Sequence, residues 1–251
     1  MKALITGASS GIGRDMAGYL SSLGWELILT ATEKSRGALI SLASELDTNC
    51  QIFCCDLSSK NGAFELYRYC QGKSIDMLVN NAGFGLFGEF DKTSLKTELD
   101  MINVNVRSLH ILTKLFLKKF KKQNRGTILN VASSAGFMTG PLMATYYATK
   151  NYVVRLSLAI NEELRRSRSK VRICVFCPGP VDTNFNSRAG VRFGVSAITS
   201  RDAAVYAIDN ALRAKTIIIP TLPMKLGVIG SRFVPHKFLA AIAYNFQKQK
   251  M

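Results

Sequence analysis

Short apolar runs alternate with longer amphipathic segments from the first residue onward. The runs are apolar throughout, which is typical of strands covered on both faces of a sheet. The segments between them repeat apolar residues every three or four positions, which predicts helices. We expect seven strands, at residues 2–6, 26–31, 51–55, 77–79, 127–132, 171–177 and 216–220. We expect helices at residues 12–23, 34–46, 60–71, 95–122, 146–166 and 201–212.

This series predicts an α/β fold, namely a Rossmann-like, doubly wound, seven-stranded parallel sheet with helices on both faces. No linker or internal repeat interrupts it, so we expect residues 1–251 to form a single dinucleotide-binding catalytic domain. Residues 184–200 are interpreted as a variable substrate loop. Residues 221–251 are interpreted as a tail, with a short amphipathic helix that carries Phe238, Ile242 and Phe246 on one face.

Composition narrows the class of protein. Hydrophobic residues make up 47% of the chain, which excludes a disordered protein, and no apolar run approaches the roughly 20 residues that span a bilayer. The chain runs directly into the first strand, which leaves no room for a signal peptide and predicts a cytoplasmic protein. The six cysteines are interpreted as reduced and mostly buried. Cys174 and Cys177 lie in a predicted strand without a second pair, so we expect no metal site.

The formal net charge of +16 has three possible explanations: binding to nucleic acid, binding to an anionic membrane surface, or a basic protein that is simply soluble. No basic-and-aromatic pattern supports nucleic-acid binding. A basic cluster ends the predicted helix 95–122, where cations complement the helix dipole. Membrane-surface contact through this cluster and the tail stays open, although we favour a tail that covers the substrate pocket or a subunit interface. The cluster consists of Lys114, Lys118, Lys119, Lys121, Lys122 and Arg125.

A glycine-rich turn follows the first predicted strand. Gly7, Gly11 and Gly13 stand there with the spacing Gly-x3-Gly-x-Gly and open the first helix. Glycine lets the backbone approach a pyrophosphate closely, and a helix N-terminus favours negative charge. The first strand–helix turn of a doubly wound sheet is a dinucleotide site, so the sequence predicts one here.

The end of the second strand bears on the choice of cofactor. An acidic residue there commonly binds the adenosine ribose, but Ala31 stands at the expected position. Lys34 and Arg36 could contact a 2′-phosphate, with help from the hydroxyls of Thr32 and Ser9. We therefore predict NADP as the cofactor, with NAD as the alternative.

A Tyr-x3-Lys pair can move a proton, because an ammonium group four residues along a helix lowers the pKa of the phenol. The chain contains this pair three times, as Tyr69/Lys73, Tyr146/Lys150 and Tyr244/Lys248. Only Tyr146 follows a strand that ends in a serine, Ser133, at the edge of the sheet where ligands bind. We predict Tyr146 as the general acid/base, with Ser133 holding the substrate oxygen.

With these motifs, residues 1 to about 220 resemble the short-chain dehydrogenase/reductase family. Within that family the chain is similar to bacterial-type members. The resemblance rests on the glycine turn, Asp56, Asn80-Asn81-Ala82-Gly83, Asn105, Ser133, Tyr146-x3-Lys150, and Pro178-Gly179 with Thr183. It implies a catalytic set of Asn105, Ser133, Tyr146 and Lys150, in which Asn105 holds a relay water. It implies that the cofactor contacts Gly7, Ser9, Ser10, Gly11, Ile12, Gly13, Thr32, Asp56, Leu57, Asn81, Ala82, Gly83, Tyr146, Lys150, Pro178, Gly179, Val181 and Thr183.

The reaction expected from this resemblance is hydride transfer between a nicotinamide cofactor and a moderately apolar ketone or secondary alcohol. The alternative is a dinucleotide-binding regulatory protein without catalysis. We expect a homodimer or homotetramer, built through helices 95–122 and 146–166. We expect residues 84–90, 134–144 and 184–199 to wall the substrate pocket, with apolar side chains Phe84, Leu86, Phe87, Phe137, Met138, Leu142, Met143 and Phe185.

Overall fold

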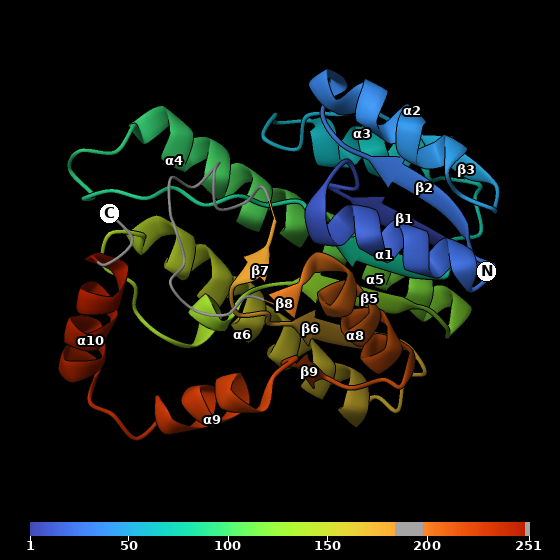
Figure 1. Ribbon diagram of the computed structural model, residues 1–251. Helices are drawn as coiled ribbons and strands as arrows, with labels where there is room; N and C mark the ends of the chain where they lie inside the picture. Colours follow the sequence, from blue (N-terminus) through green and yellow to red (C-terminus); the bar gives the residue numbers. More distant parts are fainter. Residues whose placement is uncertain (184–197, 249–251) are drawn as a thin grey trace.

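A parallel sheet of seven strands lies at the centre of the molecule, in a computed structural model that describes residues 1–183 and 198–248 (Figure 1). The order of the strands across the sheet is β3-β2-β1-β4-β5-β6-β9. From β1 the chain builds the sheet outward to β3 and then returns to place β4 on the other side of β1. The strand order therefore reverses between the neighbouring strands β1 and β4, which confirms the predicted Rossmann-like fold. The strands are β1 (Lys2–Thr6), β2 (Glu26–Thr30), β3 (Cys50–Ile52), β4 (Met77–Asn80), β5 (Thr127–Val131), β6 (Arg172–Phe176) and β9 (Ile217–Ile218).

The strands contain runs of consecutive apolar residues because successive residues enter two different cores. In β1, Ala3 and Ile5 pack against one layer of helices, and Leu4 packs against the other. The first layer contains α1 (Gly11–Ser22), α2 (Arg36–Ser44) and α8 (Ser200–Leu212). The second contains α3 (Gly62–Tyr69), α5 (Leu109–Gln123) and α6 (Ala144–Arg166).

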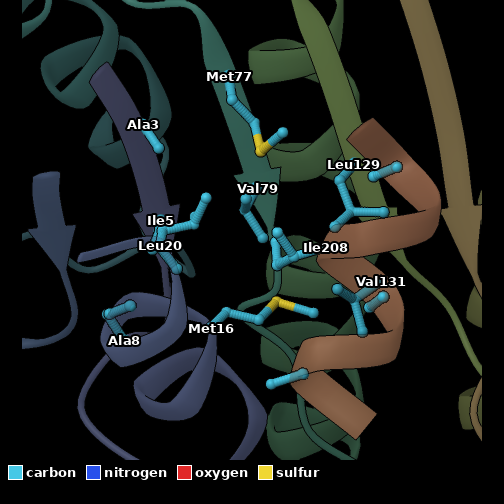
Figure 2. Close-up of a cluster of buried hydrophobic side chains, with 14 of the residues drawn as sticks. Ala3, Ile5, Ala8, Met16, Leu20, Met77, Val79, Leu129, Val131 and Ile208 are labelled. Atoms are coloured by element: carbon cyan, nitrogen blue, oxygen red, sulfur yellow. The ribbon is translucent and has the colours of Figure 1, made fainter. Parts of the chain in front are cut away.

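Figure 2 shows how closely the first core is packed. Met16 of α1 and Ile208 of α8 lie near each other over the sheet, and Leu20 of α1 lies beside Ile5 of β1, in one cluster with alternate residues of β4 and β5. These side chains are fully buried. The glycine turn, which leaves β1 directly into α1, is thereby fixed to the rigid centre of the protein.

The predicted helix over residues 95–122 is helical along its length, but its middle is wound more loosely. It consists of α4 (Leu95–Ile102), a π-helical segment η2 (Asn103–Ser108) and α5. A π turn places an additional residue in the coil and often marks a functional site. This segment carries Asn105. The helix ends at Asn124, whose left-handed backbone (φ 47°) forms the C-cap.

Two helices follow β9, the last strand of the sheet. α9 (Leu222–Gly230) has no counterpart among the predicted elements, and α10 (His236–Lys248) is the predicted tail helix. The face of α10 that is most deeply packed contains Leu239, Ala243 and Gln247, one position along from the predicted face. The described residues include no helix that is both long enough and apolar enough to cross a membrane.

Four short elements complete the described chain. η1 (Glu33–Ser35) follows β2, and η3 (Ser134–Phe137) follows β5. β7 (Val181–Asp182) and β8 (Ile198–Thr199) form a separate parallel pair. Most of the predicted substrate loop, including Phe185, lies outside the described residues.

Candidate active site

Hydrogen bonds between the ends of β1 and β4 hold the glycine turn in shape. The Thr6 hydroxyl accepts from the backbone N–H groups of Asn81 and Ala82, each at 3.0 Å. The Asn81 side chain donates to the carbonyls of Thr6 and Gly7, at 2.9 and 3.1 Å. Gly7 has a φ of +65°, and a Cβ there would stand 2.8 Å from the Cα of Ala82. Only glycine fits this close crossing of two loops.

Gly13 shows how little space the turn leaves. A Cβ at Gly13 would lie 2.3 Å from Nδ2 of Asn81 and 2.4 Å from the carbonyl oxygen of Gly7. We expect Gly13→Ala to lower the free energy of unfolding by about 1–3 kcal/mol, because the Asn81 side chain must leave its hydrogen bonds.

Gly18→Ala is the matched control for this prediction, because Gly18 lies on the same helix and a Cβ there meets nothing within 4 Å. It should raise the free energy of unfolding by about 0.5–1 kcal/mol, since alanine favours a helix interior. Urea denaturation measures both variants. Equal effects of the two substitutions would contradict the proposed crowding at Gly13.

One cavity of about 770 Å³ runs from the glycine turn along the carboxyl ends of the strands to α10. Of the predicted site residues, Gly13 and Asn105 do not line it. The predicted residues that do are Gly7, Ser9, Ser10, Gly11, Ile12, Thr32, Asp56, Leu57, Asn81, Ala82, Gly83, Ser133, Tyr146, Lys150, Pro178, Gly179, Val181 and Thr183. The turn, the backbone N–H groups of α1 and the elongated cavity fit a dinucleotide.

The cavity also contains residues that the sequence did not single out. Ser35 and Ser58 line it after β2 and β3, at the end where the adenosine of a dinucleotide would bind. Met224, Leu239 and Gln247 line it from α9 and α10. The hydroxyls after β2 and β3 follow strand ends and could have been found from the sequence. The residues from α9 and α10 carry no such signal, because no motif connects residues 220–251 to the glycine turn or to Ser133 and Tyr146.

The region after β2 determines what charge a cofactor meets. Thr32 and Ser35 line the cavity, whereas Arg36 forms a bidentate ion pair with Glu33 at the protein surface. This pair holds the pKa of the Glu33 carboxyl below its ordinary value. Asp56 accepts hydrogen bonds from the backbone N–H and the hydroxyl of Ser58, at 2.8 and 2.7 Å, and so also shapes the turn after β3.

Ser133, Tyr146 and Lys150 meet at the other end of the cavity. Ser133 caps η3 directly after β5, and Tyr146 and Lys150 lie one helical turn apart at the start of α6. The Lys150 ammonium lies 5.8 Å from the centre of the Tyr146 ring and donates to the Val131 carbonyl at 3.0 Å. These two side chains are only 8% and 5% exposed.

Burial dominates the proton affinities of this cluster. It raises the pKa of Tyr146 well above its ordinary value, and a hydrogen bond with the Ser133 side chain acts in the opposite direction. Burial also lowers the pKa of Lys150 from 10.5 to about 8. A phenol and an amine whose proton affinities depend on their surroundings are suited to general acid/base chemistry.

Asn105 lies behind this cluster, on the π-helical segment. Its amide nitrogen donates to the carbonyl of Phe84 and to the hydroxyl of Thr149, at 2.9 and 3.1 Å, and its oxygen accepts from the Phe84 N–H at 3.1 Å. Gly83 separates Asn105 from Lys150: a Cβ at Gly83 would be 2.9 Å from Oδ1 of Asn105 and 3.4 Å from Nζ of Lys150. Asn105 therefore anchors the loop that follows β4 beside Lys150.

The other two Tyr-x3-Lys pairs lie away from the cavity. The Lys73 ammonium stands 4.4 Å above the ring of Tyr69, and both side chains donate to Oε1 of Gln51. Tyr244 is exposed on α10. Among the described residues that line the cavity, Tyr146 and Tyr147 are the two tyrosines.

A switch-point glycine turn and a buried Ser–Tyr–Lys cluster on one cavity define the class of nicotinamide-dependent oxidoreductases. Comparison with known proteins gives the family. The family model described as short chain dehydrogenase matches residues 1–191. An oxidoreductase of Staphylococcus epidermidis is 32% identical over 213 residues, which are 83% of this chain and 90% of the relative.

Two solved structures show the same similarity in three dimensions. A short-chain dehydrogenase from Sphingobium yanoikuyae in complex with NADPH has a TM-score of 0.82 at 27% identity, over 92% of this chain and 93% of that one. The bulky-bulky ketone specific alcohol dehydrogenase from Comamonas testosteroni has a TM-score of 0.78 at 25% identity, over 92% of each chain. The chain belongs to the short-chain dehydrogenase/reductase family of NAD(P)-dependent oxidoreductases.

Proposed function

We propose that the protein interconverts a moderately apolar ketone and the corresponding secondary alcohol, with Tyr146 as the general acid/base. The observation that carries this proposal is the presence of Ser133, Tyr146 and Lys150 on the same cavity as the glycine turn. Any molecule bound there lies within reach of both a dinucleotide and a phenol.

Each of these side chains has a role in the proposed reaction. The nicotinamide cofactor, when bound, accepts or supplies a hydride. The Ser133 hydroxyl holds the carbonyl oxygen of the substrate beside Tyr146, which donates its phenolic proton to that oxygen during reduction. The Lys150 ammonium, held by the Val131 carbonyl, stabilises the phenolate that remains. Asn105 is a proposed member of this set and acts by holding a relay water next to Lys150.

The substrate end of the cavity is apolar. Phe84, Met138, Met143 and Met224 line it around Tyr146. Methionine side chains adapt to irregular apolar shapes, so the wall suits a hydrophobic substrate of moderate size. Carbonyl reduction on such a substrate also agrees with the name of the Comamonas protein, a bulky-bulky ketone specific alcohol dehydrogenase.

A panel of carbonyl compounds tests the proposed reaction. We expect the protein to oxidise NADPH in the presence of ketones that carry apolar groups on both sides of the carbonyl. The decrease in NADPH absorbance measures this reaction. Tight cofactor binding without turnover on any member of the panel would favour the alternative, a dinucleotide-binding regulatory protein without catalysis.

We also propose that NADP is preferred over NAD, because the residues after β2 that line the cavity (Ala31, Thr32 and Ser35) carry no carboxylate, and Lys34 and Arg36 lie next to Ser35 in the sequence. Replacing both basic residues in Lys34→Ala/Arg36→Ala should raise the Kd of NADPH about tenfold and leave that of NADH nearly unchanged. Thermal shift against each cofactor measures the two constants. A parallel loss of NADH binding would show that the pair acts on folding rather than on the 2′-phosphate.

A further inference from the structure

Exposed apolar side chains concentrate at the carboxyl end of the described chain. Eight of the seventeen large apolar residues that are exposed in the described structure lie between residues 222 and 246. On α9 and the turn after it, Leu222, Leu226, Ile229 and Phe233 follow one another at spacings of four, three and four residues. This spacing places them along one side of a helix.

α10 presents a second stripe of the same kind. Phe238 and Ile242 are 65% and 61% exposed, and both belong to the stripe that also contains Phe246. Figure 1 shows α9 and α10, in orange and red, at the end of the molecule that is remote from α1, α2 and α3. The two consecutive helices therefore carry exposed apolar side chains, of which Ile242 and Phe246 also border the cavity.

The opposite faces of these helices are attached to the body of the protein. Val228 of α9 and Leu239 of α10 are buried. The Gln247 amide donates a 2.6 Å hydrogen bond to the Tyr147 hydroxyl, next to the catalytic tyrosine. Leu222, Leu226, Ile229 and Phe233 are exposed while Val228 of the same helix is packed, and on α10 Phe238 is exposed while Leu239 is packed.

The charge of this segment has one sign. From residue 210 to residue 251 the sequence contains seven lysines and arginines and neither aspartate nor glutamate. Arg232, His236, Lys237 and Lys248 are exposed on the segment that carries the stripes. Apolar stripes flanked by cations are the pattern of helices that lie in the interface of a membrane with anionic lipids.

We infer that α9 and α10 form a docking surface for an anionic lipid bilayer. The surface consists of Leu222, Leu226, Ile229, Phe233, Phe238 and Ile242 with the flanking cations. A second copy of the chain fits this surface less well, because a two-fold contact brings each patch against its own equivalent. Arg232 and Lys237 would then face a partner of the same charge, with no carboxylate of the segment to compensate.

The docking surface borders the catalytic cavity. Met224 of α9 and Ile242 of α10 belong both to this end of the molecule and to the cavity wall. A carbonyl compound dissolved in the bilayer therefore has a short apolar route to Tyr146. This consequence rests on the proposed reaction, whereas docking itself does not depend on catalysis.

Cosedimentation with vesicles tests the docking surface. The full chain is mixed with vesicles of phosphatidylcholine alone, or with about 30% phosphatidylserine. We expect binding to the anionic vesicles that weakens at high salt. Phe233→Ser/Phe238→Ser and Arg232→Gln/Lys237→Gln should each weaken it about tenfold or more.

Two matched controls carry the same chemical changes elsewhere. Ile40→Ser/Phe64→Ser removes exposed apolar groups from α2 and α3, and Lys121→Gln/Lys122→Gln removes cations from the end of α5. Both should bind as the wild type does, and all four variants should keep its melting temperature.

Three results would overturn the docking surface: binding that the Phe233 and Phe238 changes leave intact, equal binding to neutral vesicles, or no binding at all. A dimer in light scattering that the same changes dissociate, without vesicle binding, would assign this face to a second copy instead. Vesicle binding by a Tyr146→Phe protein keeps this test separate from the proposed reaction, because the two can fail independently.

Discussion

Tyr146→Phe is expected to bind NADPH as tightly as the wild type and to lose about 10³-fold in kcat. The phenylalanine ring keeps the shape of the buried side chain but has no proton to give. General acid/base catalysis by a positioned side chain contributes about 10² to 10⁴ in rate, which sets the size of the expected loss. Steady-state kinetics on an apolar ketone, together with NADPH thermal shift, measure the two quantities separately.

Tyr69→Phe is the matched control, because Tyr69 belongs to a second Tyr-x3-Lys pair and also lies near an ammonium group. Its kcat should equal that of the wild type. Full activity of Tyr146→Phe, or an equal loss in both variants, would contradict the assignment of the proton donor.

Lys150→Met is expected to abolish turnover and yet to stabilise the fold by about 1–2 kcal/mol at neutral pH. Burial lowers the pKa of Lys150 from 10.5 to about 8, and at about 1.4 kcal/mol per unit the charged form destabilises the native state by about 3 kcal/mol. Loss of the hydrogen bond to the Val131 carbonyl offsets about 1–2 kcal/mol of this gain. Urea denaturation and turnover are measured on the same preparation.

The advantage of this variant should depend on pH. Between about pH 8 and 10.5 the unfolded wild type binds more protons at Lys150 than the folded protein does, so wild-type stability rises with pH in this window. The methionine variant lacks that rise, and the stability difference should therefore shrink toward pH 10.5. A difference that is constant with pH, or a variant less stable than the wild type at neutral pH, would show that burial of the ammonium is not the dominant effect.

The sequence predicts those parts of the molecule that depend on short-range rules. Strands buried on both faces consist mainly of consecutive apolar residues, so β1, β4 and β5 can be predicted without any tertiary information. The glycine turn is visible because Gly7 must adopt a positive φ where two loops cross. The meeting of Ser133 and Tyr146 could be predicted in part, because the carboxyl ends of parallel strands and the starts of the following helices lie at one edge of the sheet.

Other features depend on contacts between distant parts of the chain. The π-helical segment at Asn105 accompanies hydrogen bonds to Phe84 and Thr149, which no local pattern indicates. Arg36 is predicted to face a phosphate, but its pairing with Glu33 depends on the turn formed by η1. The contact of Gln247 with Tyr147 joins residues 100 positions apart, so the packed face of α10 cannot be read from its own sequence.

The small pair of strands β7 and β8 has a consequence for the evolution of specificity. Val181 pairs with Ile198 and Asp182 with Thr199, so two strands that are separated by fifteen residues in sequence are held side by side. The entropy of closing such a segment grows only slowly with its length, by about 0.6 kcal/mol per doubling. We therefore expect changes of length between these two anchors to cost little stability, which makes the connection between β7 and β8 a suitable place to graft new segments.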